Sequence, residues 1–220
     1  MQPWDSPKLM LKNKKGVIFG IANDHSIAWG IAKKLAENGA EIVITYQNES
    51  LLKRIKPLAE KIDNNFLIKC DFSEVESIKN CFKEIKKKLH NIDFIIHAAA
   101  FSDKNELNGK YLNTSKDNFI NTLNISCFSF TEIAKYASEI MNEGGSLLTL
   151  SFYGSNKVMP NYNVMGVAKA ALETSVKYLS VDLGSQNIRV NAISAGPMRT
   201  LSGAAISNAR QVYNYTQENS

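Results

Sequence analysis

The sequence predicts an α/β fold, with one parallel, doubly wound sheet that carries helices on both faces. Short apolar runs alternate with helical patterns, turn residues close most runs, and the spacing leaves room for a helix between consecutive strands. The strands are expected at residues 15–20, 41–46, 66–71, 93–97, 146–151 and 188–193. The helical patterns end near residues 38, 62, 89, 141 and 183.

The first strand leads through a loop into an apolar-periodic helix that Gly39 is positioned to end. In a dinucleotide-binding (Rossmann) unit, such a loop brings backbone amides to a pyrophosphate at the positive end of the helix dipole. Here Gly20 and Gly30 stand far apart with Ser26 between them, so the usual GxGxxG pattern is absent. An ordinary strand-to-helix turn with a serine near the helix start is the alternative.

The residues that follow the second and third strands bear on the choice of cofactor. Gln47 falls where Rossmann proteins place the residue that meets the adenosine ribose, where an acidic residue favours NAD and an arginine favours NADP. Gln47 is neutral, which favours NADH, while Lys53 and Arg54 leave NADPH open. Asp71 ends the third strand and could accept from an adenine amino group, or serve as an ordinary turn aspartate.

The second half of the chain continues the alternation towards a ligand-binding edge. Alanines 98–100 follow the fourth strand, which suits either a backbone close to a flat ligand or tight packing. Gly144 and Gly145 break the helical pattern before the fifth strand, and Pro160 lies near the start of the next long helix. The sixth strand runs into a turn at 194–200, at the carboxyl edge where open α/β sheets bind ligands.

Size and composition indicate one soluble domain, 1–220, in the cytoplasm. The 220 residues are 44% hydrophobic, enough for one sizeable core. We find no apolar run near the ~20 residues that a membrane span needs, and no signal-peptide core in 1–15. Cys70, Cys81 and Cys127 match neither a metal knuckle nor a disulfide framework, the histidines lack ligand spacing, and no metal is expected.

The formal net charge of +5 does not indicate nucleic-acid binding. Lys83 and the lysines at 86–88 form the densest basic cluster, on a helical segment where they are expected to make a solvated face. The mild basicity suits an acidic protein or ligand partner instead.

Tyr162 and Lys169 are the candidate catalytic pair. Seven residues of α-helix advance by about 700°, so the two side chains would return to nearly the same face and could serve one site. A nearby ammonium favours the phenolate and strengthens the phenol as a donor to a developing oxyanion. A surface lysine and a half-buried core tyrosine at helical spacing are the alternative.

Three blocks of sequence together resemble the enoyl-acyl carrier protein reductases of bacterial type II fatty-acid synthesis, within the short-chain dehydrogenase/reductase superfamily. They are GIANDHSIAWGIA at 20–32, PNYNVMGVAKAALE at 160–173 and RVNAISAGPMRTLS at 189–202. The resemblance covers essentially the whole chain. The usual superfamily pair is Tyr-x3-Lys, but the tyrosine slot of that pattern holds Met165, and the Tyr-x6-Lys spacing found here is the enoyl-reductase variant.

The resemblance implies reduction of a trans-2-enoyl thioester on acyl carrier protein, with NADH giving hydride to the β-carbon. Tyr162 would donate to the resulting enolate, and Lys169 would bond the nicotinamide ribose. Other implied cofactor positions are Gly20, Ser26 and Ile27 at the pyrophosphate, Gln47 at the ribose, Asp71 and Phe72 at the adenine, and Ala99, Met198, Arg199, Thr200, Leu201 and Ser202 at the nicotinamide. Ser102 would lie at the acyl chain, and 201–220 would be a mobile lid over the substrate.

The chain departs from the family pattern in two ways. Phe152 stands where many members carry a second active-site tyrosine, and we expect it to shape the substrate site without donating a hydrogen bond. Relatives also continue beyond the position of Ser220 into a further helix and strand, so the fold is expected to lack the family's C-terminal strand. By the same resemblance we expect a homotetramer. Asn124 lies near the helix asparagine of the superfamily, or is an ordinary polar helix residue.

Three functions are therefore compared. The first is an NADH-dependent enoyl reductase of fatty acid biosynthesis. The second is another short-chain reductase, although the Tyr-x6-Lys spacing argues against a carbonyl substrate. The third is a catalytically weakened nucleotide-binding or assembly protein, which Phe152 and the end of the chain at Ser220 motivate.

Overall fold

Six parallel strands form one sheet, in the order β3-β2-β1-β4-β5-β6. The computed structural model describes residues 9–63, 66–198 and 200. The chain moves outward from β1 to β3, then crosses back to β4 beside β1 and continues to β6, so the strand order reverses between β1 and β4. The predicted fold class is confirmed. The strands are β1 (Lys15–Phe19), β2 (Glu41–Tyr46), β3 (Leu67–Lys69), β4 (Ile92–His97), β5 (Met141–Ser151) and β6 (Arg189–Ser194).

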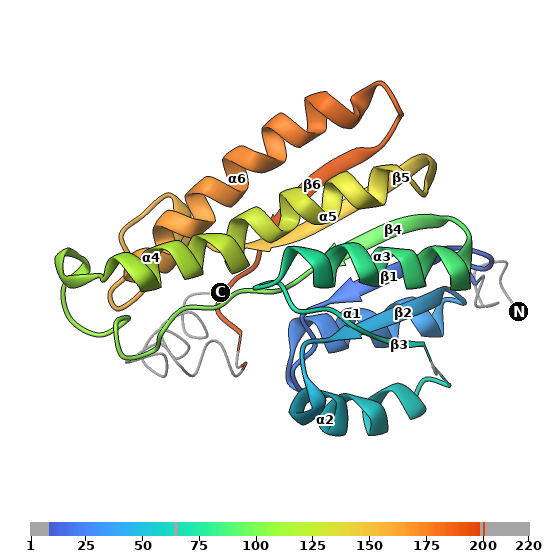
Figure 1. Ribbon diagram of the computed structural model, residues 1–220, viewed down its shortest axis with the longest axis horizontal. Coiled ribbons are helices and arrows are strands. Elements are labelled where there is room, and N and C mark those ends of the chain that lie inside the picture. The colour runs from blue at the N-terminus through green and yellow to red at the C-terminus, as the bar shows by residue number, and fades with distance from the viewer. Residues whose placement is uncertain (1–8, 64–65, 199, 201–220) are drawn as a thin grey trace, which may run out of the picture.

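Helices cover both faces of the sheet. One apolar cluster joins strand residues such as Ile18 to α1 and α2, and a larger cluster joins Val17 and Phe19 to α3, α5 and α6, because neighbouring strand residues point to opposite faces. Figure 1 shows α3 and α5 in front of the strands and α1 behind them. The helices are α1 (Ile27–Glu37), α2 (Glu49–Glu60), α3 (Val75–Leu89), α4 (Lys116–Leu123), α5 (Ser129–Ser138) and α6 (Asn163–Gly184).

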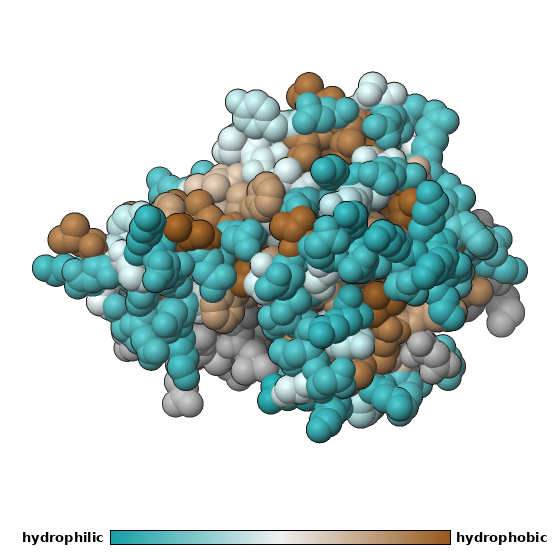
Figure 2. All heavy atoms as spheres, in the orientation of Figure 1, coloured by the Kyte–Doolittle hydropathy of each residue, from teal (hydrophilic) through white to brown (hydrophobic). Residues whose placement is uncertain are grey.

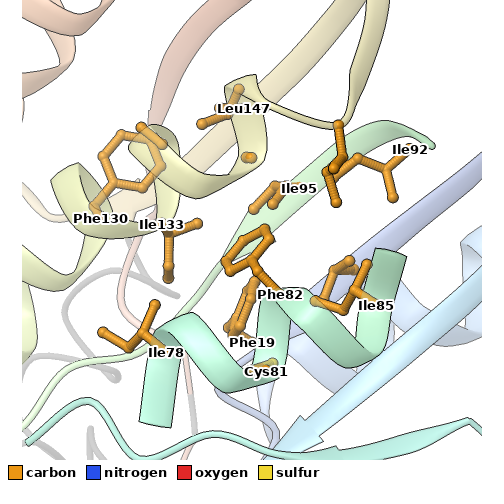
Figure 3. Packing of buried hydrophobic residues seen from close by; sticks show 14 of the residues in the cluster. Phe19, Ile78, Cys81, Phe82, Ile85, Ile92, Ile95, Phe130, Ile133 and Leu147 are labelled. Atoms are coloured by element: carbon orange, nitrogen blue, oxygen red, sulfur yellow. The ribbon is translucent and has the colours of Figure 1, made fainter. Parts of the chain in front are cut away.

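The larger cluster is the centre of the core. The Phe19 ring lies between α3 and the sheet, with its centroid 6.2 Å from that of Phe82, and both side chains are buried (Figure 3). Phe130 and Ile133 reach the same space from α5. Full burial of such side chains contributes roughly 1.5–3 kcal/mol each, so this packing fixes the layer that carries the loops at the carboxyl edge.

The fifth strand is longer than the sequence predicted, because it begins at Met141 and runs through Gly144 and Gly145. Its pairing with β4 shifts register between Ile92 and Phe94. Gly144 has φ of 77°, a conformation that glycine adopts without strain. The two glycines therefore permit an irregular stretch within the strand, whereas the sequence analysis placed them before it.

The helix expected at 115–141 ends at Ser138 and contains a π-helical turn, Asn124–Phe128, between α4 and α5. A π turn accommodates an additional residue per turn, and such turns often occur at functional sites. Short 3₁₀ turns at Tyr111–Asn113 and Tyr153–Ser155 precede α4 and α6, respectively.

The surface of α3 is hydrophilic, as Figure 2 shows in teal at the position of this helix. Lys79 pairs with Glu76 at 3.0 Å and Lys87 with Glu84 at 2.6 Å, both across one turn. Two of the lysines of α3 thus pair with glutamates on a solvated face. Within the part of the chain that the structure describes, no helix has the length and apolar character of a membrane span.

Candidate active site

A cavity of about 1230 Å³ opens at the carboxyl edge of the sheet. Loops after β1, β4, β5 and β6 and the start of α6 form its walls, so segments from the whole chain meet there. The cavity also lies beside the point where the strand order reverses, which is where open α/β sheets bind ligands. The predicted site residues that line it are Gly20, Ser26, Ile27, Ser102, Phe152, Tyr162, Lys169, Met198 and Thr200.

The loop after β1 is shaped by Gly20 and Ser26. Gly20 has φ of 97°, and a Cβ atom at this position would lie 2.4 Å from the carbonyl oxygen of Ala98, so only glycine fits. The Ser26 hydroxyl accepts from the backbone N–H groups of Ala22 (3.0 Å) and Asn23 (3.1 Å). These bonds fold the loop back on itself and leave the N-terminus of α1, at Ile27, facing the cavity.

Gln47 and Asp71 meet at the neighbouring strand ends. The Gln47 amide nitrogen donates to the two carboxylate oxygens of Asp71, at 3.2 and 3.3 Å. Partial burial raises the pKa of Asp71, but hydrogen bonds from Ser73 and Gln47 outweigh this effect and hold the pKa below its ordinary value. The carboxylate is therefore ionised at neutral pH, and the two residues form one polar pair.

Some predicted cofactor residues lie outside the cavity wall. Phe72 packs its ring against Phe19 (5.7 Å between centroids) and His97 (5.8 Å), on the core side of the strand end. Ala98 and Ala100 line the cavity, whereas Ala99 between them does not. The predicted residues Arg199, Leu201 and Ser202, and the predicted lid at 201–220, lie outside the described residues.

Tyr162 lies one residue before α6, at its N-cap position, and not within the helix as the sequence analysis assumed. Positive φ angles at Asn161 (60°) and Asn163 (41°) interrupt the helical path on both sides of it. The Tyr162 side chain is nevertheless buried and reaches the same cavity as Lys169. Burial raises the pKa of its hydroxyl above the ordinary value, so the phenol is protonated and able to donate.

Lys169 lies in the second turn of α6 and is only 6% exposed. Its ammonium donates to the Leu150 carbonyl oxygen, at 2.7 Å, near the end of β5. Burial lowers the pKa of Lys169 to about 8, although the charges of Cys127 and Glu173 oppose this shift. At neutral pH a cation is therefore fixed in the cavity that the buried phenol also lines.

The comparisons with known proteins agree with this geometry. The family model described as "Enoyl-(Acyl carrier protein) reductase" matches residues 20–220. The chain belongs to this family. An enoyl-[acyl-carrier-protein] reductase [NADH] 2 from Rhizobium meliloti is 58% identical over 211 residues, which cover 96% of this chain and 79% of the relative.

Solved reductase structures match the fold closely. FabI from Candidatus Liberibacter asiaticus has a TM-score of 0.92 and 54% identity, over 95% of this chain and 81% of that chain. The reductase from Anaplasma phagocytophilum, solved in complex with NAD, has a TM-score of 0.88 and 53% identity, over 94% of this chain and 76% of that chain. The family that the three sequence blocks indicated is thus confirmed.

Glu173 supports the site of this reductase, although its sequence pattern does not indicate this role. Its carboxylate, one helical turn after Lys169, accepts from the hydroxyls of Ser151 and Ser155 (2.6 Å to the latter) and from the Asn156 amide at 3.4 Å. These bonds fasten the segment after β5 to α6. The four-residue spacing from Lys169 was the available signal, but on a helix it is also the spacing of an ordinary surface ion pair.

A row of buried polar residues along α4 and the π turn was also missed. We call Asn118, Thr122 and Ser126 the polar row; they follow one another at four-residue spacing and are at most 7% exposed. Thr122 donates to the Ser102 hydroxyl (3.0 Å), and Asn118 accepts from the Asp103 backbone (2.9 Å).

Ser126 completes this row at the π turn. Its hydroxyl accepts from the backbone N–H of Phe101 (2.9 Å) and donates to the carbonyl oxygen of the same residue (3.0 Å). The polar row thereby holds the loop after β4. Asn124, at the start of the π turn, is half-buried and is not one of the described residues that line the cavity.

His97 is a fully buried neutral residue behind the site. Its ring nitrogens lie 2.8 Å from the Thr149 hydroxyl and 3.0 Å from the Ser129 hydroxyl. Burial, with a smaller effect of the Lys169 charge, lowers the pKa of His97 to about 3. The imidazole thus joins β4, β5 and α5 by hydrogen bonds and carries no charge near neutral pH.

Proposed function

We propose that this chain reduces the trans-2 double bond of enoyl thioesters on acyl carrier protein, with NADH as the reductant, in fatty acid biosynthesis. The observation that carries the proposal is the convergence of Tyr162 and Lys169, both buried, on one large cavity at the strand-order reversal. The Tyr-x6-Lys spacing and the membership in the reductase family fit the same reaction.

The described residues fit a dinucleotide. The cavity exceeds the roughly 300–1,000 Å³ of drug-sized sites, so a dinucleotide and an acyl chain can share it. Gly20 and the N-terminus of α1 offer close backbone approach and a positive dipole end for the pyrophosphate. The ionised Asp71, bonded to Gln47, can accept from adenosine and would repel a 2′-phosphate, which favours NADH over NADPH.

In the proposed reaction, NADH held at this site would supply a hydride to the β-carbon of the enoyl thioester and leave as NAD⁺. The electron pair of the double bond then moves to form an enolate, whose oxygen bears the negative charge. The Tyr162 hydroxyl donates a hydrogen bond to this oxygen, and a proton added at the α-carbon completes the saturated thioester. Lys169 keeps a positive charge beside this oxygen and is the proposed partner of the nicotinamide ribose.

The remaining site residues receive proposed roles. Phe152 and Ser102 would flank the acyl chain, because both line the cavity and the Phe152 ring packs against Tyr162. The cofactor contacts are proposed for Gly20, Ser26, Ile27, Gln47, Asp71, Phe72, Ala99, Lys169, Met198, Arg199, Thr200, Leu201 and Ser202. We further propose one domain over 1–220 and a cytoplasmic location, on the basis of size and composition. A substrate lid at 201–220 and assembly as a homotetramer are proposed from the family resemblance.

The direct test incubates the purified chain with NADH and a crotonyl thioester and follows the loss of nicotinamide absorbance. We expect turnover with the enoyl thioester and none with a β-ketoacyl thioester, because the tyrosine slot for carbonyl reduction holds Met165. NADH binding is measured separately by fluorescence. Tight binding without turnover would contradict the proposal and favour a nucleotide-binding protein.

A further inference from the structure

The backbone on both sides of Tyr162 adopts an uncommon conformation. Asn161 and Asn163 have φ angles of 60° and 41°, while Tyr162 between them has φ of −101°. Residues with side chains avoid positive φ, although asparagine tolerates it better than most. Such conformations persist only where surrounding contacts hold them, and they concentrate at functional sites. The contacts that hold this one therefore matter for the direction of the Tyr162 ring.

The side chain of Asn163 provides such contacts. Its amide nitrogen lies 3.2 Å from the carbonyl oxygen of Glu106, 3.2 Å from that of Leu107 and 3.4 Å from that of Gly109. Carbonyl oxygens only accept hydrogen bonds, so the nitrogen and not the oxygen of the amide must face them. One side chain thus gathers three carbonyls of a loop that lies more than fifty residues earlier in the chain.

This loop forms a wall of the cavity next to Tyr162. Glu106 and Leu107 line the cavity, and Leu107, 5% exposed, packs in one cluster with Tyr162 and Met165. On its other side, the Glu106 carboxylate accepts from the backbone N–H (2.9 Å) and hydroxyl (2.7 Å) of Ser115 at the start of α4. The loop is therefore fastened to α4 on one side and to the residue after Tyr162 on the other.

We propose that Asn163 is a positioning residue that couples the substrate wall at 106–109 to Tyr162, the proposed hydrogen-bond donor. Its backbone sets the turn that aims the phenol, and its side chain holds the wall against the same turn. Asn163 would then fix both the position of the enoyl chain and the direction of the hydrogen bond that Tyr162 donates. This inference rests on the proposed function for its kinetic consequence, but the fastening itself does not depend on turnover.

The variant Asn163→Gly separates the two contributions, because glycine keeps the positive φ and removes the amide. The matched control is Asn187→Gly. Asn187 follows the other end of α6, also has positive φ (55°), and donates at 2.6 Å to Glu143, away from the cavity. Asn163→Asp, which sets a carboxylate against the three carbonyls, gives the same comparison should the glycine variant fail to fold.

Hydrogen–deuterium exchange of the full chain tests the fastening without any need for activity. We expect amides of the peptide 104–113 to exchange at least about tenfold faster in Asn163→Gly than in the wild type, and at the wild-type rate in Asn187→Gly. Unchanged exchange in this peptide would overturn the proposal. If the wild type lacks turnover but exchange in this peptide is still faster in Asn163→Gly, the proposed function is rejected and the fastening remains supported.

Steady-state kinetics with crotonyl thioester test the coupling. If Asn163→Gly displaces Tyr162 and the wall at 106–109, kcat/KM should fall by about tenfold to a hundredfold. The KM for the thioester should rise, and the NADH dissociation constant should stay within about twofold of the wild type. A merely structural role would instead reduce the fraction of protein that binds NADH and leave KM unchanged. That result, or a kcat/KM within about twofold of the wild type, would refute the coupling.

Discussion

The ring of Phe152 meets the ring of Tyr162 edge-on, with the ring centroids 5.0 Å apart and the ring planes at 66°. This arrangement is the favourable one for two aromatic rings. Phe152 follows β5 directly, and Leu150, two residues earlier, accepts the hydrogen bond of Lys169. Residues at and just after the end of β5 therefore contact both Lys169 and Tyr162, the proposed catalytic pair, and Phe152 contacts Tyr162 through its ring alone.

Replacement of Phe152 should release the Tyr162 ring. An edge-to-face pair contributes about 0.5–1.5 kcal/mol, so we expect Phe152→Ala to lower kcat by about twofold to tenfold while the NADH dissociation constant stays unchanged. The control is Tyr153→Ala, because Tyr153 is the next residue and is 54% exposed. Equal losses in the two variants would contradict a specific role for Phe152.

Loss of the Tyr162 hydroxyl should affect the chemical step. Removal of one oxyanion donor costs about 10²–10³ in kcat, and we expect Tyr162→Phe to fall in this range with unaltered NADH affinity. Tyr178→Phe, on the exposed side of the same helix, is the matched control. A kcat of Tyr162→Phe within about twofold of the wild type would remove Tyr162 from the mechanism.

The buried cation of Lys169 should lower the stability of the fold. Its pKa is about 8 in the folded chain and near its ordinary 10.5 when unfolded, so the unfolded chain binds more protons between these pH values. The free energy of unfolding should then rise with pH from 8 to 10.5, and below pH 8 the cation costs about 3 kcal/mol.

Lys169→Met tests this cost by urea unfolding at pH 7 and pH 10. The variant loses the bond to the Leu150 carbonyl, which costs about 1 kcal/mol, so we expect a net gain of about 2 kcal/mol at pH 7 and none at pH 10. It should also bind NADH more weakly. If the variant is less stable than the wild type at both pH values, the prediction is wrong, and interactions in the folded chain offset the cost of burying the Lys169 cation.

The neutral imidazole of His97 should make the fold sensitive to acid. Its pKa is about 3 when folded and about 6.5 when unfolded, so below pH 6.5 only the unfolded chain takes up the proton. We expect the wild type to lose about 2.5 kcal/mol of unfolding free energy relative to His97→Gln between pH 7 and pH 4.5. Urea titrations at the two pH values measure this difference. An equal loss of unfolding free energy in both proteins would contradict the prediction.

The polar pair of Gln47 and Asp71 should set the cofactor preference. Gln47→Arg would place a cation beside the Asp71 carboxylate and where a 2′-phosphate binds, so we expect the NADPH-to-NADH ratio of kcat/KM to rise about tenfold. Gln47→Lys is the companion variant, because lysine supplies the charge without the planar fork of arginine. An unchanged ratio in both variants would place the ribose elsewhere.

The fold, and the position of Tyr162 and Lys169 at one cavity, were predictable because their signals are local or periodic. The apolar runs at the strands and the helical patterns between them determined the layers, and the three family blocks determined which loops reach the cavity. The break in helix geometry at Tyr162 was not visible, because a seven-residue spacing fits a continuous helix equally well. Only the φ angles of Asn161 and Asn163 show that the helix begins after the tyrosine.

The hydrogen-bonded supports of the site could not be predicted. Asn118, Thr122 and Ser126 have the four-residue spacing of a solvated helix face, and only the packing of the loop after β4 buries them. Glu173 has the spacing of a surface ion pair, yet it accepts from serines 18 and 22 residues away in sequence. Such contacts depend on which loop lies over which helix. A periodic sequence pattern carries no information about that arrangement.

The polar row has a consequence for how substrate preference can change. Directional hydrogen bonds from Thr122 and Ser126 secure the loop after β4, whereas apolar side chains such as Leu107 and Met159 form the surface that an acyl chain would touch. Thr122 and Ser126 thus fasten the loop and are not among the described residues that line the cavity. Substitutions in the lining can reshape the acyl site in small steps while its frame keeps its position, so chain-length preference and structural integrity can evolve independently.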